Sequence, residues 1–118
     1  MVDDEKDLLE IAVAYLTELG YDALEAHDAE SALRVLGRRD DVVLVITDII
    51  MPGGTNGVEL AQLAHQLNPN LKIIYTSGFP AGALQEKSMA MIDGPLLRKP
   101  YRISDFITTV SNVMKPAE

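Results

Sequence analysis

Carboxylate and amine side chains occur in this chain where they could form one site. Asp3 and Asp4 are adjacent near the start, Asp48 follows an apolar run, and Lys99 follows another. If the apolar runs are parallel strands, these groups meet at one edge of the sheet, because open α/β sheets bind ligands at the carboxyl ends of their strands. Carboxylate oxygens suit Mg²⁺, and an amine suits a phosphoryl group. The pattern predicts a small site for both.

Each of these residues also has a simpler interpretation. Asp48 could attack phosphorus as a nucleophile and form an acyl phosphate, or it could begin an ordinary turn. The acidic pair could bind a metal or favour the start of the helix near Glu5. Lys99 could pair with Asp48 or stay solvated, although the following proline excludes helix there.

Two hydroxyl groups and two histidines are further candidates. Thr76 closes a predicted strand at the same edge, where its hydroxyl could sense an added phosphoryl oxygen; Ser77 is its rival, and spacing does not choose between them. Gly53-Gly54 is not a phosphate loop, because no Gly-Lys-Ser/Thr follows. His27 and His65 have no partner spacing and are expected at the surface.

Composition narrows the functional classes. The chain has 118 residues, 10 basic and 18 acidic side chains and a net charge of −8, which argues against direct nucleic-acid binding. It has no cysteine, hence no disulfide or thiol chemistry. Neither a signal peptide nor an apolar run of membrane-spanning length is recognisable, so we expect a cytoplasmic protein without membrane insertion. One domain, residues 1–118, suits this length.

Apolar periodicity predicts alternating helices and strands. Asp28 is a candidate N-cap, and the run 42–47 is β-branched at most positions, as suits a strand buried on both faces. The alternation predicts a doubly wound α/β sheet. Expected helices cover 7–19, 28–37, 58–67, a segment from Pro80, and 103–114; expected strands cover 21–26, 42–47, 71–75 and 96–97.

Too few residues precede the acidic pair for a full first strand. Only Met1 and Val2 stand before it, although the pair should lie at the end of a strand. Either the native start lies upstream, or the first strand is very short, or another chain supplies it.

Four short motifs, in this order and spacing, resemble the receiver domain of two-component response regulators over essentially the whole chain. They are Asp3-Asp4-Glu5, Asp48-Ile49-Ile50-Met51-Pro52, Thr76-Ser77-Gly78 and Lys99-Pro100. The resemblance implies a flavodoxin-like (CheY-like) five-stranded parallel sheet of order 2-1-3-4-5, here with a truncated first strand. It also implies signalling by phosphotransfer and autodephosphorylation and no other enzymatic activity.

The resemblance assigns a role to each motif. Asp3, Asp4 and Asp48 would bind Mg²⁺, together with the backbone carbonyl of Ile50. Asp48 would accept a phosphoryl group, which Thr76 and Lys99 would then contact. The donor would be a sensor histidine kinase or a histidine phosphotransfer protein. The product would bias a two-state surface near the fourth helix and the last strand.

Three features depart from the commonest receiver pattern. The first strand is short; Leu96 replaces the aromatic residue usual three positions before the lysine; and the loop 52–57 looks one residue longer. This loop and the segment 96–101 are similar to receivers of hybrid sensor kinases. A stand-alone protein, a relay domain or a fragment of a larger chain all fit, and a homodimer is a further candidate assembly.

The first helix suggests where a partner could dock. Leu9 and Val13 lie off the stripe formed by Leu8, Ala12, Tyr15 and Leu19, so they form either an exposed docking patch or the margin of the core.

Two other functions compete with the phosphoacceptor interpretation. A receiver-like interaction module that does not cycle phosphate is favoured by the short first strand and Leu96. A metal-dependent phosphatase would need a general acid beside the nucleophile, where Ile50 stands.

Overall fold

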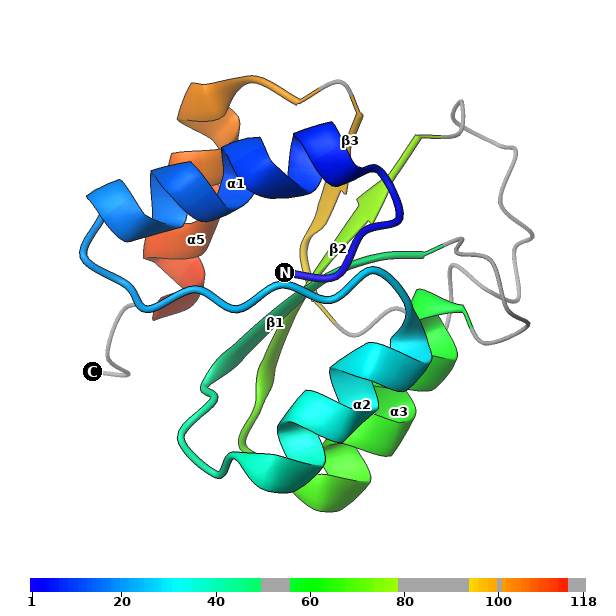
Figure 1. The fold of residues 1–118 in the computed structure, drawn as a ribbon. Coiled ribbons are helices and arrows are strands. Elements are labelled where there is room, and N and C mark those ends of the chain that lie inside the picture. The colour runs from blue at the N-terminus through cyan, green and yellow to red at the C-terminus, as the bar shows by residue number, and fades with distance from the viewer. Residues whose placement is uncertain (50–55, 79–93, 100, 115–118) are drawn as a thin grey trace.

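A parallel sheet with helices on both faces forms the molecule, as the computed structural model shows (Figure 1). The structure describes residues 1–49, 56–78, 94–99 and 101–114. Its strands are β1 (Leu44–Asp48), β2 (Lys72–Ser77) and β3 (Leu96–Arg98), which pair in the order β1-β2-β3. Its helices are α1 (Lys6–Glu18), α2 (Ala29–Arg38), α3 (Gly57–Leu67) and α5 (Ile103–Met114).

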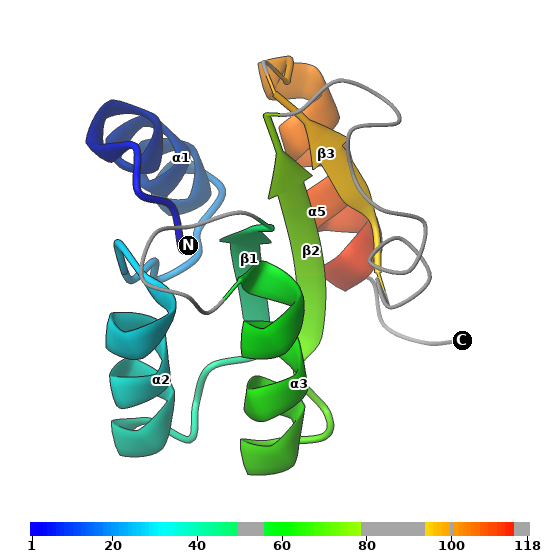
Figure 2. The same cartoon turned by 90° about the vertical axis from the view of Figure 1, so that its right-hand side faces the viewer.

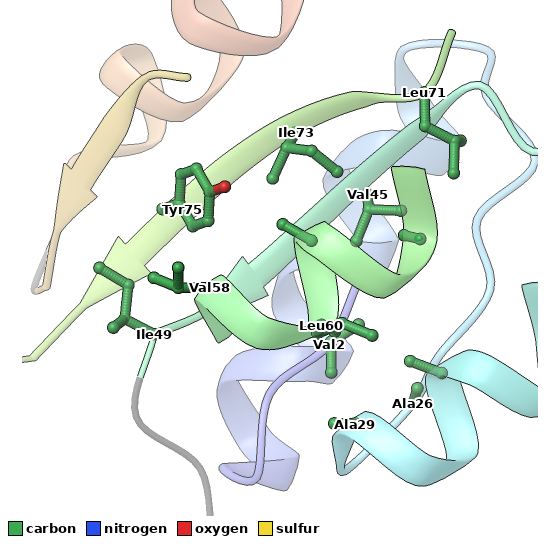
Figure 3. Packing of buried hydrophobic residues seen from close by; sticks show 13 residues of the cluster. Val2, Ala26, Ala29, Val45, Ile49, Val58, Leu60, Leu71, Ile73 and Tyr75 are labelled. Carbon is green, nitrogen blue, oxygen red and sulfur yellow. The ribbon is translucent and has the colours of Figure 1, made fainter. Parts of the chain in front are cut away.

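The helices divide into two layers, with α1 and α5 on one face of the sheet and α2 and α3 on the other (Figures 1 and 2). Alternate residues of a strand point to opposite faces. Accordingly Val45 and Ile73 pack with the α2–α3 layer (Figure 3), whereas Ile46 and Ile74 pack with α1 and α5. Burial on both faces explains why the strand sequences are continuously apolar.

Four of the predicted helices and the last three predicted strands are confirmed within two residues at their ends, and α2 begins where its cap was expected. The Asp28 carboxylate accepts the backbone N–H of Ser31 at 2.7 Å, and the Ser31 hydroxyl accepts the backbone N–H of Asp28 at 3.3 Å. Each side chain thus satisfies a donor that the helix leaves free. The helix expected from Pro80 lies outside the described residues.

The first two predicted strands are reduced to isolated bridges. Val2 bridges Ala26 on one side and Thr47 of β1 on the other, both in parallel. The spatial order Ala26–Val2–β1–β2–β3 agrees with the predicted order 2-1-3-4-5, and the first strand is short as predicted. The prediction of a strand over 21–26 is wrong, because Ala26 is the one residue of this segment that forms a strand bridge.

A cavity of about 330 Å³ opens beside the amino-terminal half of β1. Leu24, Leu44 and Val45 are among its lining residues. It follows from the short strand, because Val2 covers only one position between β1 and the segment that precedes α2. None of the helices in the described parts of the chain is long and apolar enough to cross a membrane.

Candidate functional site: the carboxyl edge of the sheet

Parallel pairing brings the ends of the strands to one edge of the sheet. β1 ends at Asp48, whose register partner in β2 is Thr76, and Lys99 directly follows β3. Val2 aligns Asp3 with the same edge, since its N–H donates to Ile46 O at 2.7 Å and its carbonyl accepts from Asp48 N at 3.0 Å. The structure therefore brings together the residues that the sequence selected.

The Lys99 ammonium is the centre of this site. Its Nζ lies 2.7 Å from Asp3 Oδ2, 3.1 Å from Asp48 Oδ2 and 3.8 Å from Glu5 Oε1. The lysine side chain is 9% exposed, so it is not a solvated surface lysine. Burial lowers the pKa of Lys99, but its hydrogen bonds and ion pairs with Asp3 and Asp48 outweigh that effect and raise the pKa overall. The amine stays positively charged at neutral pH.

Asp48 has the opposite electrostatic balance. Burial raises the pKa of its carboxyl group, and the negative charges of Asp3 and Asp4 act in the same direction; together they outweigh Lys99. Ionised Asp48 is thus a carboxylate that the folded protein holds at a cost. Added positive charge at this place would be stabilising.

Three carboxylates are close enough to share a metal ion. Asp3, Asp4 and Asp48 each offer an oxygen, and these oxygens lie within 4.8 Å of one another. Asp3 and Asp48 are buried whereas Asp4 is exposed, so the group is open to solvent on one side. An all-oxygen set with room for water fits Mg²⁺, which keeps several waters in proteins. The predicted fourth ligand, the carbonyl of Ile50, lies outside the described residues.

The register favours Thr76 over Ser77 as the hydroxyl that faces Asp48. Thr76 pairs with Asp48 across β1 and β2, whereas Ser77 pairs with Arg98 across β2 and β3. The Thr76 hydroxyl is shielded from solvent and has no hydrogen-bond partner among the described residues. Buried hydroxyls are usually hydrogen-bonded, so this one is available to a group bound at the edge of the sheet.

Sequence reasoning missed two residues of this site. Glu5 donates its backbone N–H to Asp3 Oδ1 at 2.9 Å and brings its own carboxylate to 3.8 Å from Lys99. Tyr101 has a hydroxyl that is shielded from solvent; burial raises the pKa of this hydroxyl, and the negative charge of Asp3 acts in the same direction. Their proximity to Asp3 and Lys99 along the chain was the available signal.

Two surface predictions need correction. Leu9 is only 4% exposed and packs in the core, so the docking patch placed on Leu9 and Val13 is wrong for Leu9; Val13 is half-buried. Ile11, on another side of the same helix, is 52% exposed. His27 is exposed as expected, but His65 is half-buried, with Nε2 2.9 Å from the carbonyl oxygen of Leu71.

Comparison with known proteins decides the family. The family model of the response regulator receiver domain matches residues 1–111. The chain belongs to this family. The receiver is 32% identical over 114 residues to the response regulator receiver protein CpdR of Brucella abortus, covering 97% of this chain and 93% of CpdR. It is 27% identical over 116 residues to the sensor kinase CckA of the same organism, covering 98% of this chain and 12% of the kinase.

Solved structures agree with this assignment. A response regulator receiver protein from Sinorhizobium medicae has a TM-score of 0.82 and 30% identity, and the match covers 95% of this receiver and 89% of that chain. The receiver domain of NtrX from Brucella abortus has a TM-score of 0.85 over 98% of this chain and 97% of its own, at 24% identity, and supports the fold alone. The protein is a receiver domain of two-component signalling, and its relatives include response regulators and sensor kinases.

Proposed function

We propose that Asp48 accepts a phosphoryl group from a phosphohistidine of a partner protein and that the product switches a protein-interaction surface. The observation that carries the proposal is the position of the Lys99 ammonium between the carboxylates of Asp3 and Asp48, at 2.7 and 3.1 Å. In the transfer, an oxygen of Asp48 forms a bond to phosphorus as the P–N bond breaks. The electron pair of that bond stays on the imidazole nitrogen, which takes a proton from water, and Asp48 becomes an acyl phosphate.

Asp3, Asp4 and Asp48 would hold Mg²⁺ for this reaction, because their oxygens lie within 4.8 Å of one another. The ion, when bound, would offset the negative charge of the phosphoryl oxygens. The buried Asp3 is oriented for the task by the Glu5 N–H at 2.9 Å. The solvent-exposed Asp4 leaves the open side through which a donor can approach. The carbonyl of Ile50 is the proposed fourth ligand.

Lys99 and Thr76 would hold the product. Phosphorylation turns the Asp48 carboxylate into an acyl phosphate, which is a mixed anhydride, and moves the charge outward, so the ammonium that now bonds Asp48 follows it to a phosphoryl oxygen. The Thr76 hydroxyl, which lacks a hydrogen-bond partner among the described residues, can donate to another phosphoryl oxygen. Thr76 lies near the end of β2 and Lys99 directly follows β3, so their movement reaches both strands directly.

The partner in this proposal is a sensor histidine kinase or a histidine phosphotransfer protein, acting in the cytoplasm. Since Leu9 is buried, the apolar contact of α1 with the partner falls to Ile11, whose side chain is 52% exposed. The exposed Ala14 lies three residues further along the helix, on the same side. The whole 1–118 chain is proposed to act as a single receiver domain.

Intact mass after incubation with acetyl phosphate and Mg²⁺ tests the proposal. We expect one phosphoryl adduct on the wild type and on Asp22→Asn, whose carboxylate is exposed and outside the site. We expect none on Asp48→Asn. Omission of Mg²⁺ should reduce the adduct strongly. An adduct that persists in Asp48→Asn would place the acceptor elsewhere and contradict the proposal.

A phosphorylation-independent interaction module is the second candidate, and Leu96 favours it. Leu96 pairs with Tyr75 and packs against the α2–α3 core without any hydroxyl to couple with Thr76. If a folded wild type gains no adduct from acetyl phosphate or from a cognate kinase, this second function replaces the first.

A further inference from the structure

Glu5 occupies the N-cap position of α1, but its side chain does not cap the helix. Its backbone is extended there, with φ −85° and ψ 102°, and the carboxylate makes no hydrogen bond to the first turn. Serine, threonine, aspartate and asparagine are the usual N-cap residues, because their shorter side chains reach the free N–H groups. The Glu5 carboxylate instead lies with Oε1 3.8 Å from the Lys99 ammonium. The site, and not the helix, therefore accounts for where this carboxylate lies.

The backbone of Glu5 is fixed on both sides, while its carboxylate faces solvent. The Glu5 N–H donates to Asp3 Oδ1 at 2.9 Å, and the Glu5 carbonyl accepts the Leu9 N–H at 3.0 Å. Lys99 is fixed as well, since its N–H donates to Ser77 O at 2.7 Å. The Glu5 side chain is 63% exposed, whereas the Lys99 side chain is 9% exposed. The carboxylate thus lies on the solvent side of the ammonium.

The three carboxylates around Lys99 are not equivalent. Asp3 and Asp48 lie within hydrogen-bonding distance of its Nζ, at 2.7 and 3.1 Å, and both belong to the group of oxygens that could share a metal ion. Glu5 lies beyond that distance and outside the group that the described residues form. A carboxylate that ligates a divalent cation offers less negative charge to an ammonium, and the two cations repel each other. Glu5 is then the carboxylate that remains free to pair with Lys99.

We propose that Glu5 is a positioning residue whose carboxylate holds the Lys99 ammonium on the solvent side of the site when the buried carboxylates bind a divalent cation. This inference rests on the proposed function, in which Asp3 and Asp48 hold Mg²⁺ and Lys99 then contacts the phosphoryl group. The donor approaches from the open side, where Asp4 is exposed. Glu5 therefore keeps the ammonium where the phosphoryl group arrives, and reduces its competition with the metal for the buried oxygens.

The first test observes the mobility of the Lys99 side chain and needs no phosphate. In protein labelled with ¹³C at lysine Cε, NMR relaxation reports how rigidly each ammonium is held. The Lys99 signal should indicate a rigid side chain in the wild type, both without metal and with saturating Mg²⁺. In Glu5→Gln it should be rigid without metal, because Asp3 and Asp48 hold the ammonium. With Mg²⁺ it should narrow to the width of an exposed lysine such as Lys6.

Asp7→Asn is the matched control for charge. Asp7 is exposed in the first turn of α1 and forms no ion pair with any described residue. This variant removes the same charge from the same end of the helix, so Lys99 should stay rigid with Mg²⁺. Glu5→Ser separates the site from the helix. Serine is a favoured N-cap and should raise the thermal midpoint above that of Glu5→Gln, yet Lys99 should be as mobile as in Glu5→Gln.

The second test is the affinity for Mg²⁺ by calorimetry. Glu5→Gln and Glu5→Ser should bind Mg²⁺ about two- to fivefold more weakly than Asp7→Asn. The reason is that displacement of the ammonium from the buried carboxylates is no longer offset by its pairing with Glu5. Asp7→Asn should bind Mg²⁺ nearly as the wild type does.

The outcomes separate this inference from the proposed function. A Lys99 side chain that stays rigid in Mg²⁺-saturated Glu5→Gln would overturn the role of Glu5, even if Asp48 is phosphorylated normally. Equal Mg²⁺ affinities for Glu5→Gln and Asp7→Asn would overturn it as well. A wild type that binds no Mg²⁺ would reject this inference together with the proposed metal site. Conversely, Lys99 mobility that depends on Glu5, in a protein that accepts no phosphoryl group, would support the role of Glu5 and reject the phosphoacceptor function.

Discussion

The two sides of β1 differ in how much backbone pairing they make with the neighbouring segments. On one side β1 pairs with β2 along its whole length, from Leu44↔Lys72 to Asp48↔Thr76. On the other side a single residue, Val2, bridges to it, and a cavity begins next to that bridge. Asp48 is thus placed by a continuous ladder, whereas Asp3 is placed by a few backbone hydrogen bonds. The backbone pairing that positions Asp48 is therefore much more extensive than the pairing that positions Asp3.

Lys99 partly compensates for the weak backbone pairing of the segment that carries Asp3. It reaches the site from the end of β3, the strand farthest from Val2, and contacts both Asp3 and Asp48. An ion pair is therefore a main connection between the weakly paired side of β1 and the rest of the sheet edge. The same group that is proposed to bind phosphate also stabilises the unphosphorylated fold.

Replacing Lys99 should give the largest effect. Lys99→Met leaves the fully buried Asp3 carboxylate without its cation, and we expect a loss of about 3–5 kcal/mol in the free energy of unfolding at neutral pH. Added Mg²⁺ should stabilise this variant more than the wild type, because the ion no longer competes with an ammonium. Chemical denaturation with and without Mg²⁺ measures both effects. A loss below 1 kcal/mol would mean that the backbone alone holds Asp3.

Adding a side chain at Gly57, next to the Asp48 end of β1, should lower the stability of the protein. A Cβ on Gly57 would overlap the backbone carbonyl oxygen of Asp48, so Gly57→Ala should cost on the order of 3 kcal/mol. Gly37→Ala in α2 is the control; no atom lies within 4 Å of its added Cβ, and alanine should gain about 0.5–1 kcal/mol in a helix. Similar thermal midpoints for Gly57→Ala and Gly37→Ala would show that the backbone at the Asp48 end of β1 can shift to accommodate the added methyl group.

A matched pair of core deletions compares the two sides directly. Val2 is 3% and Val45 is 4% exposed, and both belong to the same apolar cluster. Val2→Ala and Val45→Ala should each cost about 2 kcal/mol. Only Val2→Ala should also weaken Mg²⁺ binding several-fold, because it loosens the residue that precedes Asp3. Equal losses of metal affinity would remove the distinction between the two sides.

The smallest expected effect is a pH-dependent gain from Asp48→Asn in metal-free buffer. Because burial raises the pKa of Asp48 in the folded protein, the folded state holds this proton more tightly than the unfolded chain. Stability is therefore lost as pH rises past the ordinary value of 3.8, and asparagine avoids that loss. The thermal midpoint of Asp48→Asn should exceed that of the wild type by more at pH 7 than at pH 4. Asp22→Asn should show no such trend.

The sequence predicted the elements and the convergence of Asp3, Asp48 and Lys99 because strong local signals determine both. Buried parallel strands are continuously apolar, and a charged residue directly after such a run must lie at the edge of the sheet. Asp28 was predictable as a cap for the same local reason. The roles assigned to the site residues remain predictions.

The errors arise where tertiary packing chooses between local alternatives. Apolar residues cover so much of α1 that two stripes could face the core, and the fold buries Leu9 and exposes Ile11. The segment 21–26 has strand-like composition, but a strand needs a neighbour, and Val2 provides one at a single position. The approach of Glu5 to Lys99, at 3.8 Å, depends on how the segment before α1 meets the residue after β3, which no periodicity encodes.

The single bridge at Val2 also has a consequence for how fast the amide protons of β1 exchange with solvent. The N–H groups of odd-numbered residues such as Val45 face β2, whereas those of even-numbered residues face the Val2 side, where Val2 accepts from Asp48 N. The Ile46 N–H points the same way, one position beyond the bridge and toward the cavity that Ile46 helps to line. Protection should therefore alternate along one strand, with a slow amide at Val45 next to a fast one at Ile46.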